Sequence, residues 1–160
     1  MIAVSTSLVH LLLFFHIMAA IVAFGPSYSF PIIMAMSRKD PQHMVFGAKL
    51  IHTISSKVTK LGAIAAGILG VLLILAGDWS LKDNPWLLIS LLVYAIALTF
   101  SILVQGPNSE RMVELLSAAT PGEAPSAETM DLGKRLQMGG TMLGVAVMFL
   151  VLLMVFKPGA

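Results

Sequence analysis

Four long apolar runs dominate this chain, and each is about as long as a membrane is thick. They cover residues 8–36, 61–76, 86–104 and 132–156, and the second run can extend back to about residue 43. A helix that rises about 1.5 Å per residue needs roughly 20 residues to cross about 30 Å of hydrocarbon. The sequence therefore predicts an integral membrane protein with four transmembrane helices.

The composition supports this class. Hydrophobic residues make up 58% of the chain, charged residues make up 11%, and the mean hydropathy is +0.92, all far from the averages of a soluble domain. The connections between the runs are short, so residues 1–160 are expected to form a single membrane domain. The predicted fold is all-α: an antiparallel bundle of helices at approximately 8–36, 43–76, 86–105 and 130–156, with a short amphipathic cytoplasmic helix between the third and the fourth.

The positions of the basic residues predict the orientation. Most of them lie in the first and third connections or beside them, namely Arg38, Lys39, Lys49, Lys57, Lys60, Arg111, Lys134 and Arg135. The positive-inside rule then places both of these connections in the cytoplasm and both termini outside. Because no Lys or Arg precedes Arg38, the first segment lacks the basic region of a cleaved signal peptide and is expected to be retained. Basic residues beside apolar runs favour lipid headgroups over nucleic acid as their partners.

The first two helices are longer than a bilayer requires. Gly25-Pro26 and Pro31 predict a kink or break in the first helix. In the second, residues 43–59 are expected to form an amphipathic extension, with a polar stripe of Lys49, Thr53, Ser56 and Lys60 and with His52 and Thr59 beside it. The stripe is read as a solvated or lipid-facing surface. The alternative is a binding surface for an anionic ligand or lipid, made of Lys49, His52, Lys57 and Lys60.

Cap and breaker residues mark the remaining helix ends. Asn84 is expected to cap the third helix, with Pro85 in its first turn. Ser109 is expected to cap the short amphipathic helix, residues 110–119. The breaker-rich segment 120–125 then forms a linker to the fourth helix.

Small residues at four-residue spacing predict close contacts between helices. They form three sets: Ala19, Ala23 and Ser27; Gly62, Ala66 and Gly70; and Gly140 with Gly144. This spacing lets helix backbones approach closely in lipid. It does not distinguish a contact within one chain from a contact between subunits.

His16 is the only strongly ionisable side chain expected deep inside an apolar run. Tyr94 lies at the same depth of about 12 Å, counted from the outer edge of each helix. A buried imidazole needs a hydrogen-bond partner, so the two side chains are predicted to form a structural pair. A proton relay or contact with a quinone is the alternative. Gln105, Gln137 and Thr141 are read as interhelical hydrogen bonds of the inner leaflet.

Histidines on the helices of a bundle are the usual ligands of haem b, so haem b is considered as a cofactor. His16 and His52 are about 20 Å apart along the membrane normal, and His10 lies on another side of the first helix, so none of these pairs can share one iron within a chain. His16 with a methionine, His16 from two subunits, or a site formed by His43 and His52 remains open. His16 is a metal ligand only if haem is bound. No phosphate loop, nucleophile elbow or zinc-protease motif is present, so no catalytic residue is predicted.

The segments VHLLLFFHIMAA (residues 9–20) and VAFGP (residues 22–26), followed by a second helix that carries His and Lys, resemble a bacterial family of predicted four-helix integral membrane proteins of unknown function. The resemblance covers nearly the whole chain and implies this fold in a bacterial cytoplasmic membrane. More distantly, the His-bearing first helix and the Lys-bearing second helix resemble the membrane protoporphyrinogen oxidase and copper-resistance-D type bundles, some of which bind haem.

The function predicted from these observations is that of a structural or accessory membrane protein. Such a protein works as a homo-oligomer or as a small subunit of a larger membrane complex. A b-haem or quinone-linked redox protein that uses His16, with Tyr94 or His52 near the cofactor, is the alternative. Transport of a small solute is a second alternative function.

Overall fold

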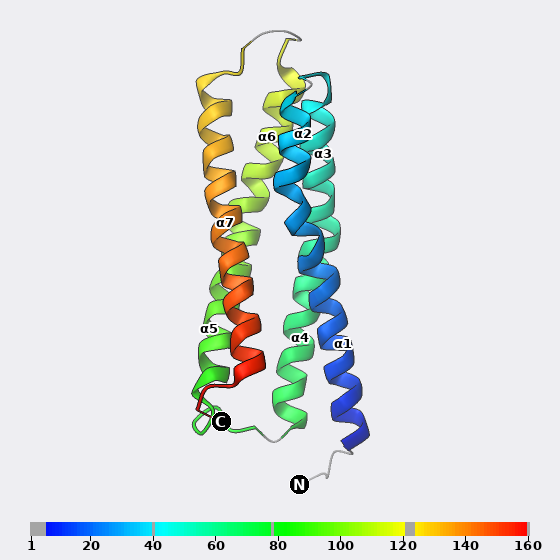
Figure 1. Cartoon of the computed structure of the whole chain (residues 1–160), viewed down its shortest axis with the longest axis vertical. Coiled ribbons are helices and arrows are strands. Elements are labelled where there is room, and N and C mark those ends of the chain that lie inside the picture. The colour runs from blue at the N-terminus through cyan, green and yellow to red at the C-terminus, as the bar shows by residue number, and fades with distance from the viewer. Residues whose placement is uncertain (1–5, 40, 78, 121–123, 160) are drawn as a thin grey trace.

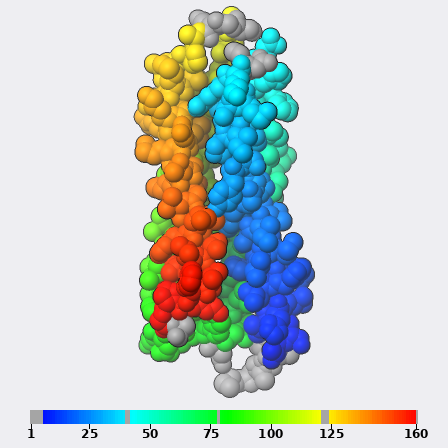
Figure 2. All heavy atoms as spheres, in the orientation of Figure 1, coloured from blue at the N-terminus to red at the C-terminus, as the bar shows by residue number. Residues whose placement is uncertain are grey.

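A computed structural model describes residues 6–39, 41–77, 79–120 and 124–159. In this part of the chain all regular elements are helices, and four helical spans run up and down side by side. Figure 1 shows the bundle with its long axis vertical, and Figure 2 shows the same view with all atoms. The predicted all-α bundle of four transmembrane helices is confirmed.

Each span is longer than a bilayer needs. The first contains α1 (Thr6–Phe24), η1 (Gly25–Ser29) and α2 (Phe30–Lys39), and the second, after the short turn η2 (Pro41–His43), contains α3 (Met44–Ile54), η3 (Ser55–Thr59) and α4 (Lys60–Ala76). The third contains α5 (Pro85–Phe100), η4 (Ser101–Gln105) and α6 (Gly106–Ala118), and the fourth is α7 (Ala127–Phe156). The spans have 34, 33, 34 and 30 residues, and all are apolar enough to cross a membrane.

Three of the four spans change their helical geometry at a similar height. η1 is a 3-10 helix, whereas η3 and η4 are π-helical turns. Counted at 1.5 Å per residue from Thr6, Ala76 and Pro85, which lie at the same end of the bundle, all three begin about 25–30 Å along their spans. This distance is close to the thickness of a hydrocarbon core.

The residues of these turns explain their geometry. The predicted break at Gly25-Pro26 is present as η1, and α2 restarts at Phe30 with Pro31 in its first turn. In η3 the Ser55 hydroxyl donates to the carbonyl oxygens of Ile51 at 2.9 Å and His52 at 3.3 Å. A hydroxyl that bonds back to the preceding turn competes with the backbone ladder and bends a helix.

The spans associate as two pairs. α1 packs along α4 and α2 packs along α3, while α5 and α6 both pack on α7. The two pairs meet mainly where α3 packs against α6, and α4 touches α5 much less. The first span makes little contact with α7, and Figure 2 shows a furrow between these two columns.

The end of the bundle near Trp79 and Trp86, called the tryptophan end below, is tied together by aromatic contacts. Trp86 is buried with Leu87 and Leu153, and its ring meets that of Trp79 edge to face at 5.4 Å. The Lys157 ammonium group lies 4.9 Å from the centre of the Trp79 ring, a favourable cation–π contact. The C-terminal end of α7 is thereby held against the loop that precedes α5.

Two predicted helix starts differ from the structure. Ser109 lies inside a helix, because α5 continues through η4 into α6 without interruption. The amphipathic segment is therefore an extension of the third span. Asn84 does occupy the position before α5, with Pro85 in the first turn, but its side chain donates to the carbonyl oxygen of Ser80 and does not cap the helix.

Candidate functional site

The best-defined polar contacts inside the membrane region converge on α4. Its α4 small-residue face consists of Gly62, Ala63, Ala66, Gly67 and Gly70. Toward α1, a methyl group at Gly62 would lie 3.0 Å from the Ala23 side chain, and Ala23 itself is 0% exposed. Toward α5, a methyl group at Gly67 would lie 2.8 Å from the Tyr94 ring. The predicted close packing of the Ala23 and Gly62 sets is therefore present, and it lies within one chain.

His16 is half-buried against this face. Its Nδ1 lies 2.9 Å from the carbonyl oxygen of Ala66, and the ring also covers Gly70, where a methyl group would lie 3.2 Å from the imidazole Cε1. A carbonyl oxygen can only accept, so Nδ1 carries the proton when it makes this bond. The neutral ring then keeps its lone pair on Nε2.

Tyr94 reaches the same helix from the other side. Its hydroxyl donates to the carbonyl oxygen of Ala63, one turn of α4 away from the Ala66 carbonyl that holds His16. The expected bond between His16 and Tyr94 is thus replaced by two separate bonds to α4. The physical reason is that glycines at positions 67 and 70 leave backbone carbonyls accessible to both rings.

The remaining histidines lie apart from His16. His52 is half-buried on α3, and its Nδ1 is buried without a hydrogen-bond partner. It precedes Ala66 by 14 residues, which corresponds to about 20 Å along the second span. His10 is exposed on α1, and His43 is exposed immediately before α3. His43 and His52 are nine residues apart on one helix, about 13 Å, which is too far to share one metal ion. In the described part of the chain no group of three or more His, Asp or Glu residues converges on one metal site.

The lysine surface predicted on the second span divides at the π turn. Lys49, Thr53, Lys57 and Lys60 are exposed, but Ser56 is half-buried and its hydroxyl donates to the carbonyl oxygen of Thr53. The wider π turn rotates the residues that follow it, so Lys57 and not Ser56 lies on the exposed side of the helix. His52 points its buried Nδ1 away from solvent, so it does not lie on the exposed track with the lysines.

Gln105 and Thr141, both predicted to form interhelical hydrogen bonds, differ in their bonding partners. Gln105 Nε2 donates to the carbonyl oxygen of Leu136 on α7, which confirms an interhelical bond, and a methyl group at Gly139 would lie 2.8 Å from the Gln105 side chain. Thr141, by contrast, donates to the carbonyl oxygen of Gln137 within its own helix. Gln105 therefore connects the third and fourth spans, and Thr141 does not.

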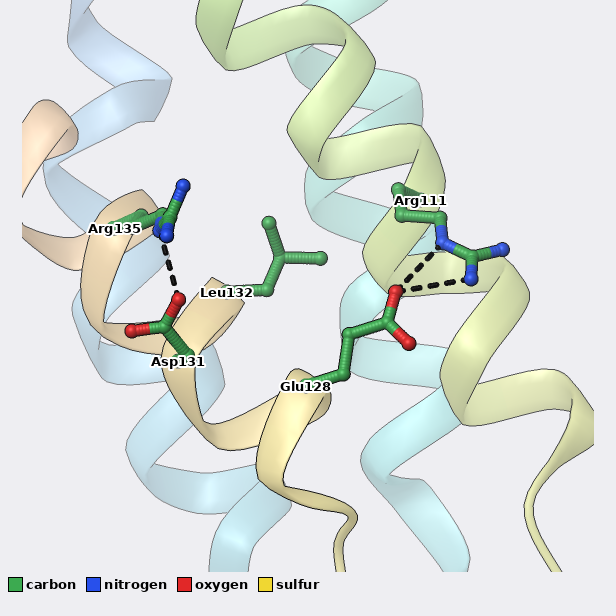
Figure 3. Close-up of a pocket in the computed structure, with 5 residues that line it drawn as sticks. All are labelled: Arg111, Glu128, Asp131, Leu132 and Arg135. Carbon is green, nitrogen blue, oxygen red and sulfur yellow. Dashed lines mark hydrogen bonds and ion pairs between the residues drawn. The ribbon is translucent and has the colours of Figure 1, made fainter.

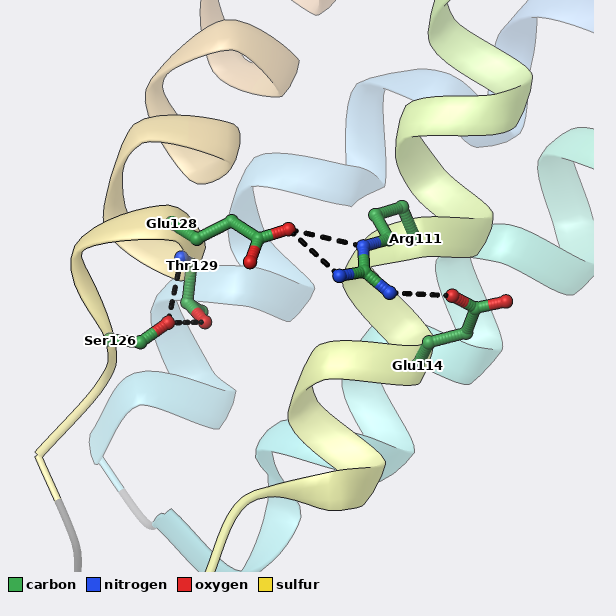
Figure 4. A network of polar contacts seen from close by, with 5 residues as sticks. All are labelled: Arg111, Glu114, Ser126, Glu128 and Thr129. Atoms are coloured by element: carbon green, nitrogen blue, oxygen red, sulfur yellow. Dashed lines mark hydrogen bonds and ion pairs between the residues drawn. The ribbon is translucent and has the colours of Figure 1, made fainter.

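An ion-pair cluster that the sequence reading missed joins α6 to α7. Arg111 contacts Glu128 through Nε at 3.1 Å and through Nη2 at 2.9 Å, and its Nη1 contacts Glu114 at 3.1 Å (Figure 4). Nearby, Arg135 contacts Asp131 at 2.8 Å (Figure 3). A shallow cavity of about 220 Å³ is lined by Arg111, Glu128, Asp131, Leu132 and Arg135. The opposite charges one turn apart were visible in the sequence, but the pairing across the linker was not.

This cluster has a structural explanation. Its charged side chains are all more than half exposed, so solvent screens the pairs and each contributes little to stability. Ser126 caps α7 by accepting from the Thr129 amide at 3.2 Å, which fixes the start of the helix that carries Glu128 (Figure 4). Because each arginine faces a carboxylate, the cavity has no free charge to bind an anion. The cluster therefore holds α6 against the start of α7.

The fold and these contacts define an integral membrane protein with four spans. Residues 10–158 match the model of a family described as predicted integral membrane proteins, DUF2269. The chain belongs to this family. No curated protein and no solved structure matches it.

Proposed function

We propose that the protein is a structural or accessory membrane protein that works through helix association, as a homo-oligomer whose copies meet along α7. One observation carries the proposal. Gly62, Gly67, Gly70 and Gly139 each have a side chain from another span within 3.2 Å of where a methyl group would lie. At Gly144 nothing lies within 4 Å, and at Gly140 the nearest such atom is 3.9 Å away.

The surroundings of these two glycines favour a protein contact. Gly140 is exposed, and the exposed residues Gln137, Thr141 and Met148 share its side of α7 at helical spacing. We call this surface the α7 glycine face. Glycines let two helices approach closely, and a Gln side chain gains a hydrogen bond when it faces another helix instead of lipid. Both features suit a second copy of α7 better than they suit acyl chains.

The test is the mass of the particle in detergent or nanodiscs. Wild type is expected to form a defined oligomer, and Gly144→Leu is expected to run as a monomer. Nothing lies within 4 Å of a Cβ at Gly144, so its melting temperature should fall only by what the contact between copies contributes. Gly139→Leu is the matched control, since it meets Gln105 and should lower the melting temperature instead. A monomeric wild type, or an oligomer that Gly144→Leu leaves intact, would refute the proposal.

We also propose that the protein lies in a bacterial cytoplasmic membrane with both termini outside. The unpaired basic residues of α2, α3 and η3 support this orientation through the positive-inside rule. The chain has no cysteine, so Ala124→Cys and Ser80→Cys can be labelled with an impermeant thiol reagent in intact cells. Labelling at position 80 but not at position 124 is expected, and the reverse pattern would invert the orientation.

The bond of His16 favours one second candidate, a b-haem or quinone-linked redox protein. A histidine that donates Nδ1–H to a backbone carbonyl presents Nε2 as a ligand or acceptor, which is how metal-bound imidazoles are commonly held. An absorption spectrum of the purified protein separates the two functions. Under the redox function a Soret band is present and His16→Ala abolishes it, while Tyr94→Phe leaves it nearly intact. Under the structural function neither variant changes the spectrum.

A further inference from the structure

Charge is distributed unevenly at the end of the bundle opposite the tryptophan end, called the charged end below. On α6 and the start of α7, the arginines Arg111 and Arg135 are paired with carboxylates. On α2, α3 and the turns that follow, five basic side chains are exposed and none forms an ion pair with the described residues: Arg38, Lys39, Lys49, Lys57 and Lys60. Described residues of this side include no Asp or Glu. Asp40, the one acidic residue in the sequence of this segment, lies outside the described residues. Five basic residues against one acidic residue still give this side of the charged end an excess of positive charge.

Depth separates these five residues into two groups. Lys60 and Lys57 precede Ala76 by 16 and 19 residues, or about 24 and 28 Å, which places them at the edge of a hydrocarbon core of about 30 Å. Lysines at that level reach the headgroups by extending their side chains. They are explained by lipid contact alone.

The other three cations lie farther out. Lys49 precedes Ala76 by 27 residues, or about 40 Å, and Lys39 follows Thr6 by 33 residues, or about 50 Å. Each headgroup layer adds only about 5–7 Å to the hydrocarbon. Even with the average helix tilt of about 20°, which shortens these heights by only a few per cent, the Cα atoms of Lys39 and Lys49 lie at or beyond the outer edge of the headgroups. Lipid contact therefore accounts for them less well than for Lys57 and Lys60.

Large apolar side chains are exposed on the same two helices. On α2, Ile32 and Met36 share one face with Lys39, and Met36 is 67% exposed. On α3, Phe46 is 65% exposed and shares a face with Lys49. By the same count Met36 and Phe46 each lie about 45 Å from the tryptophan end, outside the hydrocarbon. We call these five residues the α2–α3 surface.

The helices that carry this surface are firmly held. α2 and α3 approach so closely that Ser37 is buried and a methyl group at Gly47 would overlap the Ser37 hydroxyl. α3 also packs against α6 of the neighbouring pair. A partner would therefore meet a preformed surface and would not have to order it.

We propose that the α2–α3 surface binds an acidic amphipathic helix of a partner protein outside the membrane. Its apolar side chains suit the apolar face of such a helix, and its cations are complementary to carboxylates beside that face. The surface is separate from the α7 glycine face, so this inference stands or falls independently of the proposed homo-oligomer.

The probe is a fluorescent helical peptide with Leu on one face and Glu on the other, titrated onto the protein in nanodiscs of neutral phosphatidylcholine. Anisotropy is expected to show binding that weakens with added salt. Lys39→Glu with Lys49→Glu should weaken it by on the order of tenfold or more. The matched control, Lys57→Glu with Lys60→Glu, reverses the same number of charges at the lipid level and should change the affinity by less than about twofold.

A second variant pair tests the apolar contribution. Met36→Ser with Phe46→Ser replaces two exposed side chains, so it should leave the melting temperature unchanged and weaken peptide binding. A peptide of the same composition in scrambled order should bind much less.

Three results would overturn the proposal: no binding of the acidic peptide, equal binding of the scrambled peptide, or equal losses from the two lysine pairs. Vesicles that contain phosphatidylglycerol provide the lipid arm. If they bind the detergent-purified protein and the Lys39→Glu/Lys49→Glu variant loses this binding, the surface is a lipid site and the proposal is wrong.

Discussion

α4 and α7 both carry glycines at the spacing that allows helices to pack closely, yet the structure uses them differently. On α4, the α4 small-residue face is covered by Ala23 and His16 from one side and by Tyr94 from the other. On α7, Gly139 is covered by Gln105, while Gly140 and Gly144 face outward. Glycine spacing alone therefore indicates that a close approach is possible and does not identify the partner.

Polar side chains distinguish the two cases. His16, Tyr94 and Gln105 each bond a backbone carbonyl of a neighbouring span, and each lies against a glycine of that span. In lipid, apolar side chains gain little by leaving their surroundings, so van der Waals packing and hydrogen bonds decide which helices meet. Thr141 on the α7 glycine face bonds only its own helix, which leaves that face available to another chain.

The largest effect that separates the two helices is expected from Gly62→Leu. The new side chain would meet the backbone of Ala23, with Cα at 3.1 Å and N at 3.2 Å, and backbone atoms cannot move aside as a side chain can. Overpacking of this kind costs about 3 kcal/mol. The melting temperature in detergent should fall sharply, whereas Gly144→Leu should lower it much less, because it loses only the contact between copies. Equal melting temperatures would show that α1 and α4 are not held as described.

A smaller effect is expected from Gly67→Ala. The added methyl group would lie 2.8 Å from the Tyr94 ring, which must shift and lose its bond to the Ala63 carbonyl. The cost should be about 1–2 kcal/mol in equilibrium unfolding. Because both changes break the same bond, adding Tyr94→Phe should cost less in Gly67→Ala than in wild type. Strict additivity would mean that Tyr94 does not act through this contact.

Removing one polar contact at a time should have a still smaller effect. His16→Gln and Tyr94→Phe each remove one interhelical hydrogen bond to α4. Such bonds contribute about 0.5–2 kcal/mol in membrane bundles. His16 and Tyr94 bond different carbonyls, so the double variant should show nearly additive losses in a chemical unfolding series. A large coupling energy between the two changes would instead indicate that His16 and Tyr94 contact each other directly.

The charged end should give the smallest effect. Glu128→Gln removes the exposed pair that links α6 to α7, and Arg111 keeps Glu114 as a partner. The loss of stability should be the smallest of the series and should vanish in high salt, because solvent and ions screen this pair. A loss of stability as large as that from Gly67→Ala would mean that the ion pair between α6 and α7 stabilises the bundle as much as the contact of Tyr94 with α4.

The sequence predicted the number of spans, the break near Gly25 and close helix packing at the sets that contain Ala23 and Gly62, because apolar length, proline and small-residue spacing act locally. It also predicted that His16 and Tyr94 bond each other, which is wrong: each bonds a backbone carbonyl of α4. A backbone carbonyl carries no sequence signature, so these partners could not be predicted. The π turns η3 and η4 were not predicted, because a wider helical turn has no characteristic residues. In η3 its effect is that position 57 is exposed where a regular α-helix would expose position 56.

The central claim is that the outward glycines of α7 meet a second copy of the same helix, and cysteine cross-linking in native membranes tests it most directly. Gly144→Cys should form disulfide-linked dimers under mild oxidation, because disulfides require Cα atoms within about 7 Å. Ile68→Cys, exposed on α4, is the control and should remain monomeric. Dimers at position 144 alone are the predicted result. Absent cross-links at 144, or equal yields at both positions, would contradict the account.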